Sequence, residues 1–205
     1  MSTWAIVVAA GRGERFGERK QYQPLGGQRV LDWAVRSARR HCDGVVLVVP
    51  ADAVERPEPG VDAVVAGGAT RSASVRNGLA AVPDDVDVIV VHDAARPVPA
   101  PGVWERVLSA VASGAAAAVP GVPVTDTLRT VDGGTVDRSA FVAVQTPQAF
   151  AATALRSAHA SRGEASDDAS LVEAAGGRVE VVEGDPINLK ITTTADLALA
   201  EHLCR

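Results

Sequence analysis

Short apolar runs alternate along the chain with segments in which apolar residues recur every three or four positions. Runs such as "VVLVV" at 45–49 and "VDVIVV" at 86–91 are typical of buried strands bounded by loops. The wider spacing, as at Leu31, Ala34 and Val35, indicates amphipathic helices. Alternation of the two predicts an α/β fold, with a mostly parallel, Rossmann-like sheet covered by helices on both faces. The predicted strands are 3–9, 45–49, 62–65, 86–91, 115–119 and 178–182, and the predicted helices are 31–42, 70–82, 103–111, 150–160, 167–175 and one that opens at Thr193.

The pattern changes between residues 122 and 145. There "VPVTDTLRTV" alternates with a period of two, Asp132-Gly133-Gly134 supplies a turn, and "TVDR" resumes the alternation. This succession indicates a β-hairpin that projects from the sheet as an arm. We therefore expect a single domain over 1–205, with 122–145 forming a β-arm of the kind that often pairs with a second subunit.

Composition narrows the class of protein. A chain of 205 residues favours one domain, and with 47% hydrophobic but only 3% aromatic residues its core is expected to consist of Ala, Val and Leu. A net charge of -5 lacks the broad basic surface of a nucleic-acid binder. Cys42 and Cys204 give neither a disulfide framework nor a metal-binding CxxC pair. No apolar run approaches the roughly 20 residues of a membrane span. These features predict a soluble, cytoplasmic protein that binds neither nucleic acid nor membranes.

Residues 6–22, "IVVAAGRGERFGERKQY", place a basic, glycine-containing loop directly after the first predicted strand. Glycine lets backbone amides approach phosphate oxygens closely. The loop lacks the GxxxxGK[ST] sequence of a Walker loop, and Phe16 occupies the sixth position of the GxGxxG dinucleotide fingerprint. What remains is a strand, then AAGxGxR, then a lysine, which indicates a phosphate-binding loop of another type.

Lysine is rare in this chain. Of the 20 basic residues, Lys20 and Lys190 are the two lysines. A preference for arginine codons could leave two lysines by chance, or these two positions could require a compact ammonium in place of a planar guanidinium. Both lysines fall inside the motifs described next, which favours the second interpretation.

The segment "AAGRGERFGERKQY" resembles the signature loop of nucleotidyltransferases that load sugar or polyol phosphates with a nucleoside monophosphate. More narrowly, it resembles the 2-C-methyl-D-erythritol 4-phosphate cytidylyltransferase family. The likeness covers nearly the whole chain, and it departs from one form of the family at Ala69, where that form has an acidic residue. The other matching strings are "GGATRSASVRNG" at 67–78, "VHDAARP" at 91–97, "PVTDT" at 123–127, "TVDR" at 135–138 and "EGDPINLKITTTADLALAE" at 183–201.

The resemblance implies cytidylyl transfer from CTP to 2-C-methyl-D-erythritol 4-phosphate with release of pyrophosphate, in the non-mevalonate route to isoprenoid precursors. It also implies Mg²⁺ as the divalent cation and a homodimer formed through the 122–145 arm. We assign Arg15 and Lys20 to stabilisation of the transition state, because cations must offset the charge that develops at the α-phosphate in such a reaction. The implied nucleotide contacts are Ala9, Ala10, Gly11, Gly13, Gly68, Ser74 and Asp93; the implied acceptor contacts are Asp93, Thr127, Arg138 and Lys190; and Asp93 lies near the metal ion.

The nucleophile of such a transfer is a phosphate oxygen with a second pKa of about 6, so neither a nucleophilic side chain nor a general base is expected. Three alternatives stay open on the sequence. A ribitol 5-phosphate cytidylyltransferase would share the chemistry but differ in its acceptor. A non-catalytic nucleotide-binding module would share the loop but not the reaction, and a nicotinamide oxidoreductase is a more distant third.

Several motif residues are expected to be structural. Arg96 would hold its own loop, and His92 would pack as a buried neighbour of Asp93. The string "QTPQAF" would shape the loop before the next helix, with no role for its second glutamine. Ser166 would cap the helix that follows, and the two aspartates after it would lie in the first turn, where the helix dipole favours acidic residues.

Overall fold

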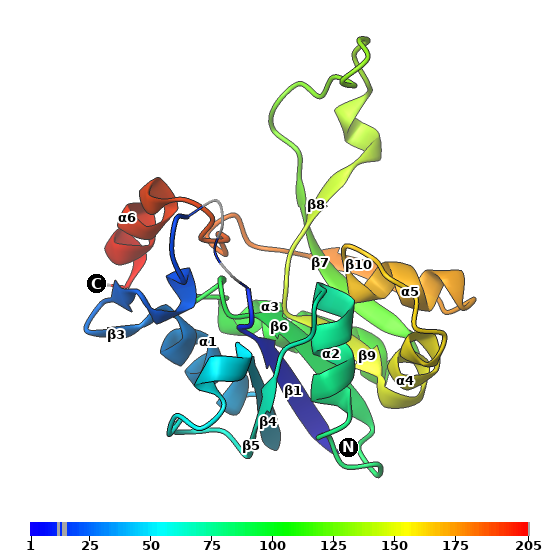
Figure 1. Cartoon of the computed structure of the whole chain (residues 1–205). Helices are drawn as coiled ribbons and strands as arrows, with labels where there is room; N and C mark the ends of the chain where they lie inside the picture. Colours follow the sequence, from blue (N-terminus) through cyan, green and yellow to red (C-terminus); the bar gives the residue numbers. More distant parts are fainter. Residues whose placement is uncertain (12, 14–15, 205) are drawn as a thin grey trace.

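The computed structural model describes residues 1–11, 13 and 16–204, and its main feature is one eight-stranded sheet (Figure 1). A separate hairpin joins β2 (Pro24–Leu25) to β3 (Gln28–Arg29). The large sheet runs in the order β10 (Val179–Glu183), β7 (Ala117–Pro123), β9 (Gln148–Ala151), β6 (Val88–Asp93), β1 (Thr3–Val8), β4 (Gly44–Val49) and β5 (Ala63–Ala66), and β8 (Val142–Val144) pairs with β7.

The sheet is mostly parallel, which confirms the predicted fold class. β1 pairs in parallel with β4 and with β6, β4 with β5, and β10 with β7. In this register Val8 lies opposite both Val48 and Asp93. The carboxyl ends of the three central strands therefore meet at one edge, where ligands of open α/β sheets bind.

The structure corrects the predicted helix over 150–160, because its first two residues belong to a strand. β9 lies between β6 and β7 and runs antiparallel to both, and α4 (Ala152–Ala160) begins directly after it. Phe150 is fully buried there. A four-residue strand that continues into a helix without a turn residue cannot be separated from that helix by periodicity. The "QTPQAF" string therefore ends inside the sheet, beyond the loop predicted for it.

Helices cover both faces of the sheet. The interior consists mainly of Val, Ala and Leu side chains, as the composition predicts, and Trp104 and Phe150 are its largest buried members. None of the helices in the described part of the chain is long and apolar enough to cross a membrane. α1 (Val30–Arg39) and α3 (Pro101–Ala112) pack on one face, and α2 (Arg71–Leu79), α4 and α5 (Asp168–Ala174) pack on the other.

Side-chain caps start the last two helices. The predicted box at Thr193 and Asp196 is confirmed at the start of α6 (Thr194–Leu203), where each side chain accepts the other residue's backbone N–H. The predicted cap of α5 is wrong by one residue. Asp167, in an extended conformation, accepts the N–H three residues on, so Asp167 and not Ser166 is the N-cap.

The chain between β7 and β8 projects away from the body (Figure 1). β7 and β8 pair antiparallel at its base, and beyond them a single bridge joins Arg129 to Thr135. The resumed alternation at "TVDR" forms no second strand; the short 3-10 helix η3 (Arg138–Ala140) follows there instead. A two-stranded ribbon without a surface to pack on is marginally stable, and Val131 near the tip is fully exposed. Side-chain alternation alone therefore predicted more pairing than the arm contains.

Candidate active site

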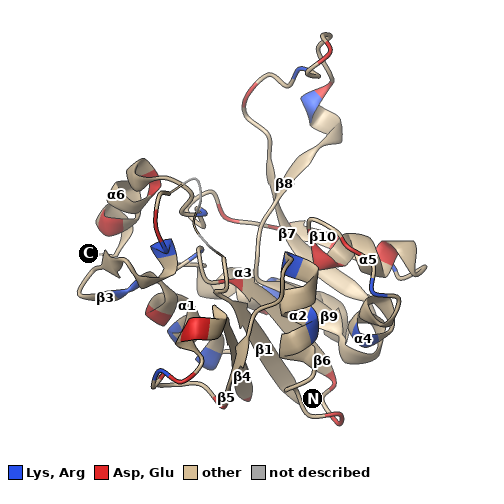
Figure 2. Ribbon diagram, in the orientation of Figure 1, with Lys and Arg blue, Asp and Glu red and all other residues tan. Residues whose placement is uncertain are grey.

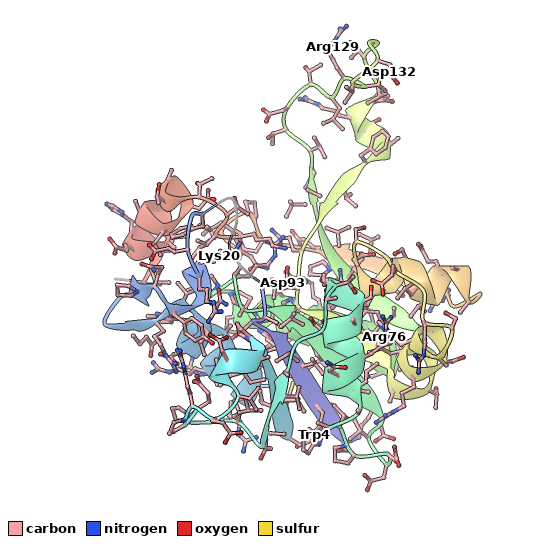
Figure 3. All side chains as sticks on the ribbon, in the orientation of Figure 1. Trp4, Lys20, Arg76, Asp93, Arg129 and Asp132 are labelled. Atoms are coloured by element: carbon pink, nitrogen blue, oxygen red, sulfur yellow. The ribbon has the colours of Figure 1, made fainter. Side chains whose placement is uncertain are left out.

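A cavity of about 730 Å³ opens at the carboxyl ends of β1 and β6. Four segments far apart in the sequence meet there: the loop after β1, the turn before α2, the residues after β6 and the residues before α6. Lys20 and Asp93 are labelled at this edge in Figure 3. The site residues predicted from sequence that line the cavity are Ala9, Ala10, Gly11, Gly13, Lys20, Gly68, Ser74, Asp93 and Lys190.

Gln21 fixes the path of the loop after β1. It lies in the short 3-10 helix η1 (Lys20–Tyr22), and its side chain is buried. Its Nε2 atom donates to the carbonyl oxygen of Ala9 at 2.8 Å and to that of Gly11 at 3.1 Å. Lys20 is thereby anchored next to the end of β1. Gln21 was not predicted to have a role, because an amide that bonds backbone carbonyls leaves no residue spacing to detect.

Gly13 and Gly17 offer a matched test of how tightly this loop packs. Their φ angles are +72° and +89°, but a Cβ on Gly13 would lie 1.8 Å from the carbonyl oxygen of Glu18, whereas nothing lies within 4 Å of a Cβ on Gly17. We expect Gly17→Ala to cost about 1 kcal/mol of backbone strain. Gly13→Ala must also move the loop, and we expect it to weaken binding of CTP, the nucleotide that the resemblance implies, by about tenfold, or 1.4 kcal/mol. Calorimetric CTP titration and thermal unfolding measure both effects; equal CTP affinities in the two variants would contradict the prediction.

The turn before α2 contributes backbone to the cavity wall. The Ser74 hydroxyl donates to the carbonyl oxygen of Thr70 at 2.9 Å and accepts the N–H of Gly68 at 3.1 Å. A Cβ on Gly67 would lie 2.2 Å from the Cβ of Ala10, so the turn packs against the loop after β1 at a distance that requires glycine. The two backbone segments therefore form one continuous wall, and the Ser74 hydroxyl is used to hold it.

Asp93 is the centre of the charged part of the site. Lys190 Nζ lies 2.6 Å from Asp93 Oδ2, and Arg71 Nε lies 3.7 Å from Asp93 Oδ1. Burial by itself raises the pKa of Asp93, but Lys190 and Arg71 outweigh burial and the pKa falls to about 2. The carboxylate is therefore ionised at neutral pH and pairs with two cations that line the cavity.

Buried polar groups support Asp93 from behind. The Asp93 N–H donates to Thr146 Oγ1 at 3.0 Å, and His92 Nδ1 lies 3.1 Å from the same oxygen. Burial lowers the pKa of His92 to about 4, so its imidazole is neutral and its Nε2 donates to the carbonyl oxygen of Arg96. Arg96 in turn donates to the carbonyl oxygen of Asn188 at 2.6 Å. His92 and Arg96 are structural, as predicted, and join the Asp93 loop to the segment that carries Lys190.

Arg71 and Thr192 also line the cavity, although neither was predicted from the sequence to have a role. Arg71 is the first residue of α2, directly after the capping residue Thr70. An arginine in the first turn of a helix that follows a Gly-Gly turn is the signal that could have found it. Thr192 left no such signal, since its place depends on how α6 packs.

The described residues that line the cavity do not include three of the predicted site residues. Arg15 falls outside the described residues. Thr127 and Arg138 lie on the arm, and neither lines the cavity of its own chain. Arg138 donates to the carbonyl oxygen of Thr125 and lines a second cavity, of about 500 Å³, at the base of the arm. The structure thus gathers one set of predicted residues at the sheet edge and keeps the arm residues apart from it.

The charge distribution agrees with a local site for anions. Basic and acidic side chains are interspersed over the body of the molecule (Figure 2). Within the cavity, Lys20, Arg71 and Lys190 face a single acidic residue, Asp93, among the described lining residues. A glycine loop and three cations at the carboxyl edge of a parallel sheet are suited to a polyphosphate. The fold and this site together define a protein of the nucleotidyltransferase type.

Comparison with known proteins identifies the family. Residues 3–205 match the family model described as 2-C-methyl-D-erythritol 4-phosphate cytidylyltransferase. The chain therefore belongs to the 2-C-methyl-D-erythritol 4-phosphate cytidylyltransferase family. A protein of that name from Nocardia farcinica is 46% identical over 216 residues, which cover 98% of this chain and 94% of the relative. The crystal structure of the Thermus thermophilus protein of that name is similar with a TM-score of 0.86 and 40% identity, over 100% of both chains.

Longer relatives carry the same unit. A protein named "Bifunctional enzyme IspD/IspF" from Nitratidesulfovibrio vulgaris (strain DP4) is 42% identical, and the match covers 98% of this chain but 58% of that protein. The fold and family described here therefore account for one part of such a protein.

Proposed function

We propose that this chain transfers the cytidylyl group of CTP to 2-C-methyl-D-erythritol 4-phosphate, releasing pyrophosphate, in isoprenoid precursor biosynthesis. The observation that carries the proposal is the convergence of Lys20, Asp93 and Lys190 on the cavity that also contains the glycine loop. An oxygen of the acceptor phosphate forms a bond to the α-phosphorus of CTP, and the bond from that phosphorus to the bridging oxygen of the β-phosphate breaks. The acceptor phosphate, with a second pKa of about 6, is already largely anionic at neutral pH.

The chief barrier to this reaction is electrostatic, because two polyanions must meet and negative charge develops at the α-phosphate. Fixed cations and positioning lower such a barrier. We assign stabilisation of that charge to Lys20 and Arg15, and binding of the triphosphate to the backbone from Ala9 to Gly13. Lys190 binds the acceptor phosphate, for which it leaves Asp93.

The donor groups of the cavity suit Mg²⁺ that enters the site bound to the phosphates of the nucleotide. Asp93 is the one carboxylate among the described lining residues, and the described chain holds no group of three or more His, Cys, Asp or Glu residues suited to a metal. Mg²⁺ is commonly held by one or two carboxylates together with substrate phosphates and waters. We propose Asp93 as the protein ligand of Mg²⁺. Bound there, the ion would neutralise phosphate charge.

The proposed assembly is a homodimer formed through the 122–145 arm. Thr127 and Arg138 lie outside the cavity of their own chain, and the arm exposes apolar side chains at Val131, Phe141 and Val142. In a symmetric pair each arm would cover these side chains on the other copy and bring its two polar residues to that copy's cavity.

The free thiols of Cys42 and Cys204 suit a reducing compartment, and we propose the cytoplasm.

A side-by-side acceptor assay tests the function. With CTP and Mg²⁺, we expect pyrophosphate release to be at least about 100-fold more efficient with 2-C-methyl-D-erythritol 4-phosphate than with ribitol 5-phosphate, a difference of about 2.7 kcal/mol in transition-state binding. Coupled detection of pyrophosphate measures both rates. Preference for ribitol 5-phosphate would instead support the alternative acceptor. CTP binding with no release of pyrophosphate from CTP in the presence of either acceptor would support a non-catalytic module.

A further inference from the structure

A buried carboxylate lies directly behind the nucleotide cavity. Asp168, in the first turn of α5, is fully buried. Its Oδ2 accepts a hydrogen bond from Arg71 Nη1 at 2.7 Å, and its Oδ1 lies 2.9 Å from His159 Nε2. Both carboxylate oxygens are therefore occupied, one by the wall of the cavity and one by α4. A buried charge without such partners would be strongly unfavourable.

Arg71 extends this contact into the cavity. Its Nε atom lies 3.7 Å from Asp93 Oδ1, beyond hydrogen-bond length, while its Nη1 binds Asp168. A guanidinium has five N–H donors, and Asp168 takes the one short hydrogen bond that Arg71 makes within the described chain. The side chain is 24% exposed and lines the cavity. Arg71 is thus held from one side and retains donors for a ligand on the other.

We propose that Arg71 is a further anion-binding residue of the nucleotide cavity, and that Asp168, supported by His159, is the positioning residue that holds it there. This inference rests on the proposed function, because it assigns the anion to the triphosphate of CTP. A guanidinium fork binds phosphate with fixed geometry. Asp168 fixes one Nη atom of Arg71 in place. The Arg71 side chain therefore loses less rotamer freedom when it binds phosphate.

The position of Asp168 separates this role from a general stabilising tie between α2 and α5. An acid that merely joined two helices could pair with any cation along α2. A second ion pair on α2 offers a comparison: Arg76, five residues further along the same helix, donates at 2.6 Å to the carboxylate of Glu164, which lies in the loop before α5, and Arg76 does not line the cavity. Figure 3 shows Arg76 on α2 away from Asp93. Arg76 and Glu164 therefore form a control ion pair on the same helix, outside the cavity.

The test measures the KM for CTP and the dissociation constant of inorganic tripolyphosphate. Variants of Asp168 and Arg71 are compared with control variants of Glu164 and Arg76. Asp168→Asn and Arg71→Lys are each expected to raise the KM for CTP about tenfold, with a smaller change in kcat, because a lost charged hydrogen bond weakens ground-state and transition-state binding alike. The dissociation constant of inorganic tripolyphosphate, measured by calorimetry, is expected to rise by a similar factor. The double variant is expected to lose no more than about threefold beyond either single one, since coupled residues are not additive.

The control variants Glu164→Gln and Arg76→Lys are expected to leave both constants within about twofold of the parent protein, as exposed ion pairs contribute little. The proposal is overturned if Asp168→Asn and Arg71→Lys lower the melting temperature but leave the CTP KM and tripolyphosphate affinity at the control level. If Asp168→Asn does not fold, Arg71→Lys and Arg71→Gln decide the result. A parent protein that binds tripolyphosphate but shows no turnover would count against the proposed function alone.

Discussion

Lys20→Ala is expected to lower kcat by about 10²–10³-fold while weakening CTP binding by less than about tenfold. Lys20 lines the cavity next to the loop that Gln21 anchors, and in the proposed function its ammonium group stabilises the reacting phosphate. Negative charge grows at the α-phosphate as the acceptor attacks, and a cation placed there is most useful in the transition state. Steady-state kinetics with both substrates varied, together with calorimetric CTP titration, separate the two effects.

Arg19→Ala provides the control for Lys20. Arg19 precedes Lys20 in the chain, but its side chain pairs with Asp52 at 2.8 Å on the surface and does not line the cavity. We expect kcat and KM of this variant to stay within about twofold of the parent values, because exposed pairs of this kind contribute little. If Lys20→Ala instead raised the KM for CTP and left kcat unchanged, Lys20 would be a binding residue without a catalytic role.

Mixing Lys20→Ala with Arg138→Ala is expected to restore about one quarter of the active sites, if each arm completes the cavity of a symmetric partner. Lys20→Ala damages the cavity of its own chain, and Arg138→Ala damages the arm. After random exchange, half of the dimers are mixed, and each mixed dimer contains one site with an intact Lys20 and an intact Arg138. The measurement is pyrophosphate release at low acceptor concentration, since Arg138→Ala is expected mainly to raise the KM for the acceptor.

The control is each variant mixed with itself under the same exchange conditions, where no activity should return. Analytical ultracentrifugation confirms that the exchanged samples are dimers. If the mixed dimers are no more active than the mean of the two single-variant samples, Arg138 acts at the cavity of its own chain or takes no part in catalysis. A monomeric protein with full activity would refute the proposed dimer.

Much of the fold could be predicted from sequence because its central strands are long, apolar and bounded by clear breakers. The run at 45–49 ends at Pro50, and the run that starts at Thr3 ends in a glycine loop. β9 was missed for the opposite reason: four residues pass into α4 with no breaker between them. The arm was over-predicted because alternation records which side chains could share a face, not whether another surface exists to bury that face.

The site divides in a similar way. Motif strings led to Lys20, Asp93 and Lys190, which the structure places around one cavity. Gln21 and Asp168 could not be found in this way, because their partners are carbonyl groups or side chains from distant segments. Such contacts exist only after the sheet has assembled, and they follow no fixed spacing along the chain. Arg71 lies between these cases, since its place in a helix start was visible but its partner was not.

The glycine wall beside Ala10 has a consequence for resistance to inhibitors. A Cβ on Gly67 would lie 2.2 Å from the Cβ of Ala10, and a Cβ on Gly68 would lie 2.4 Å from that of Ala73. Any larger residue at either glycine must push the wall out of place, and CTP bound as proposed would lose the same surface as an inhibitor that contacts this wall. A compound whose hydrogen bonds go to this backbone should therefore select few escape mutations there, whereas one that depends on an exposed side chain can be evaded by a single substitution.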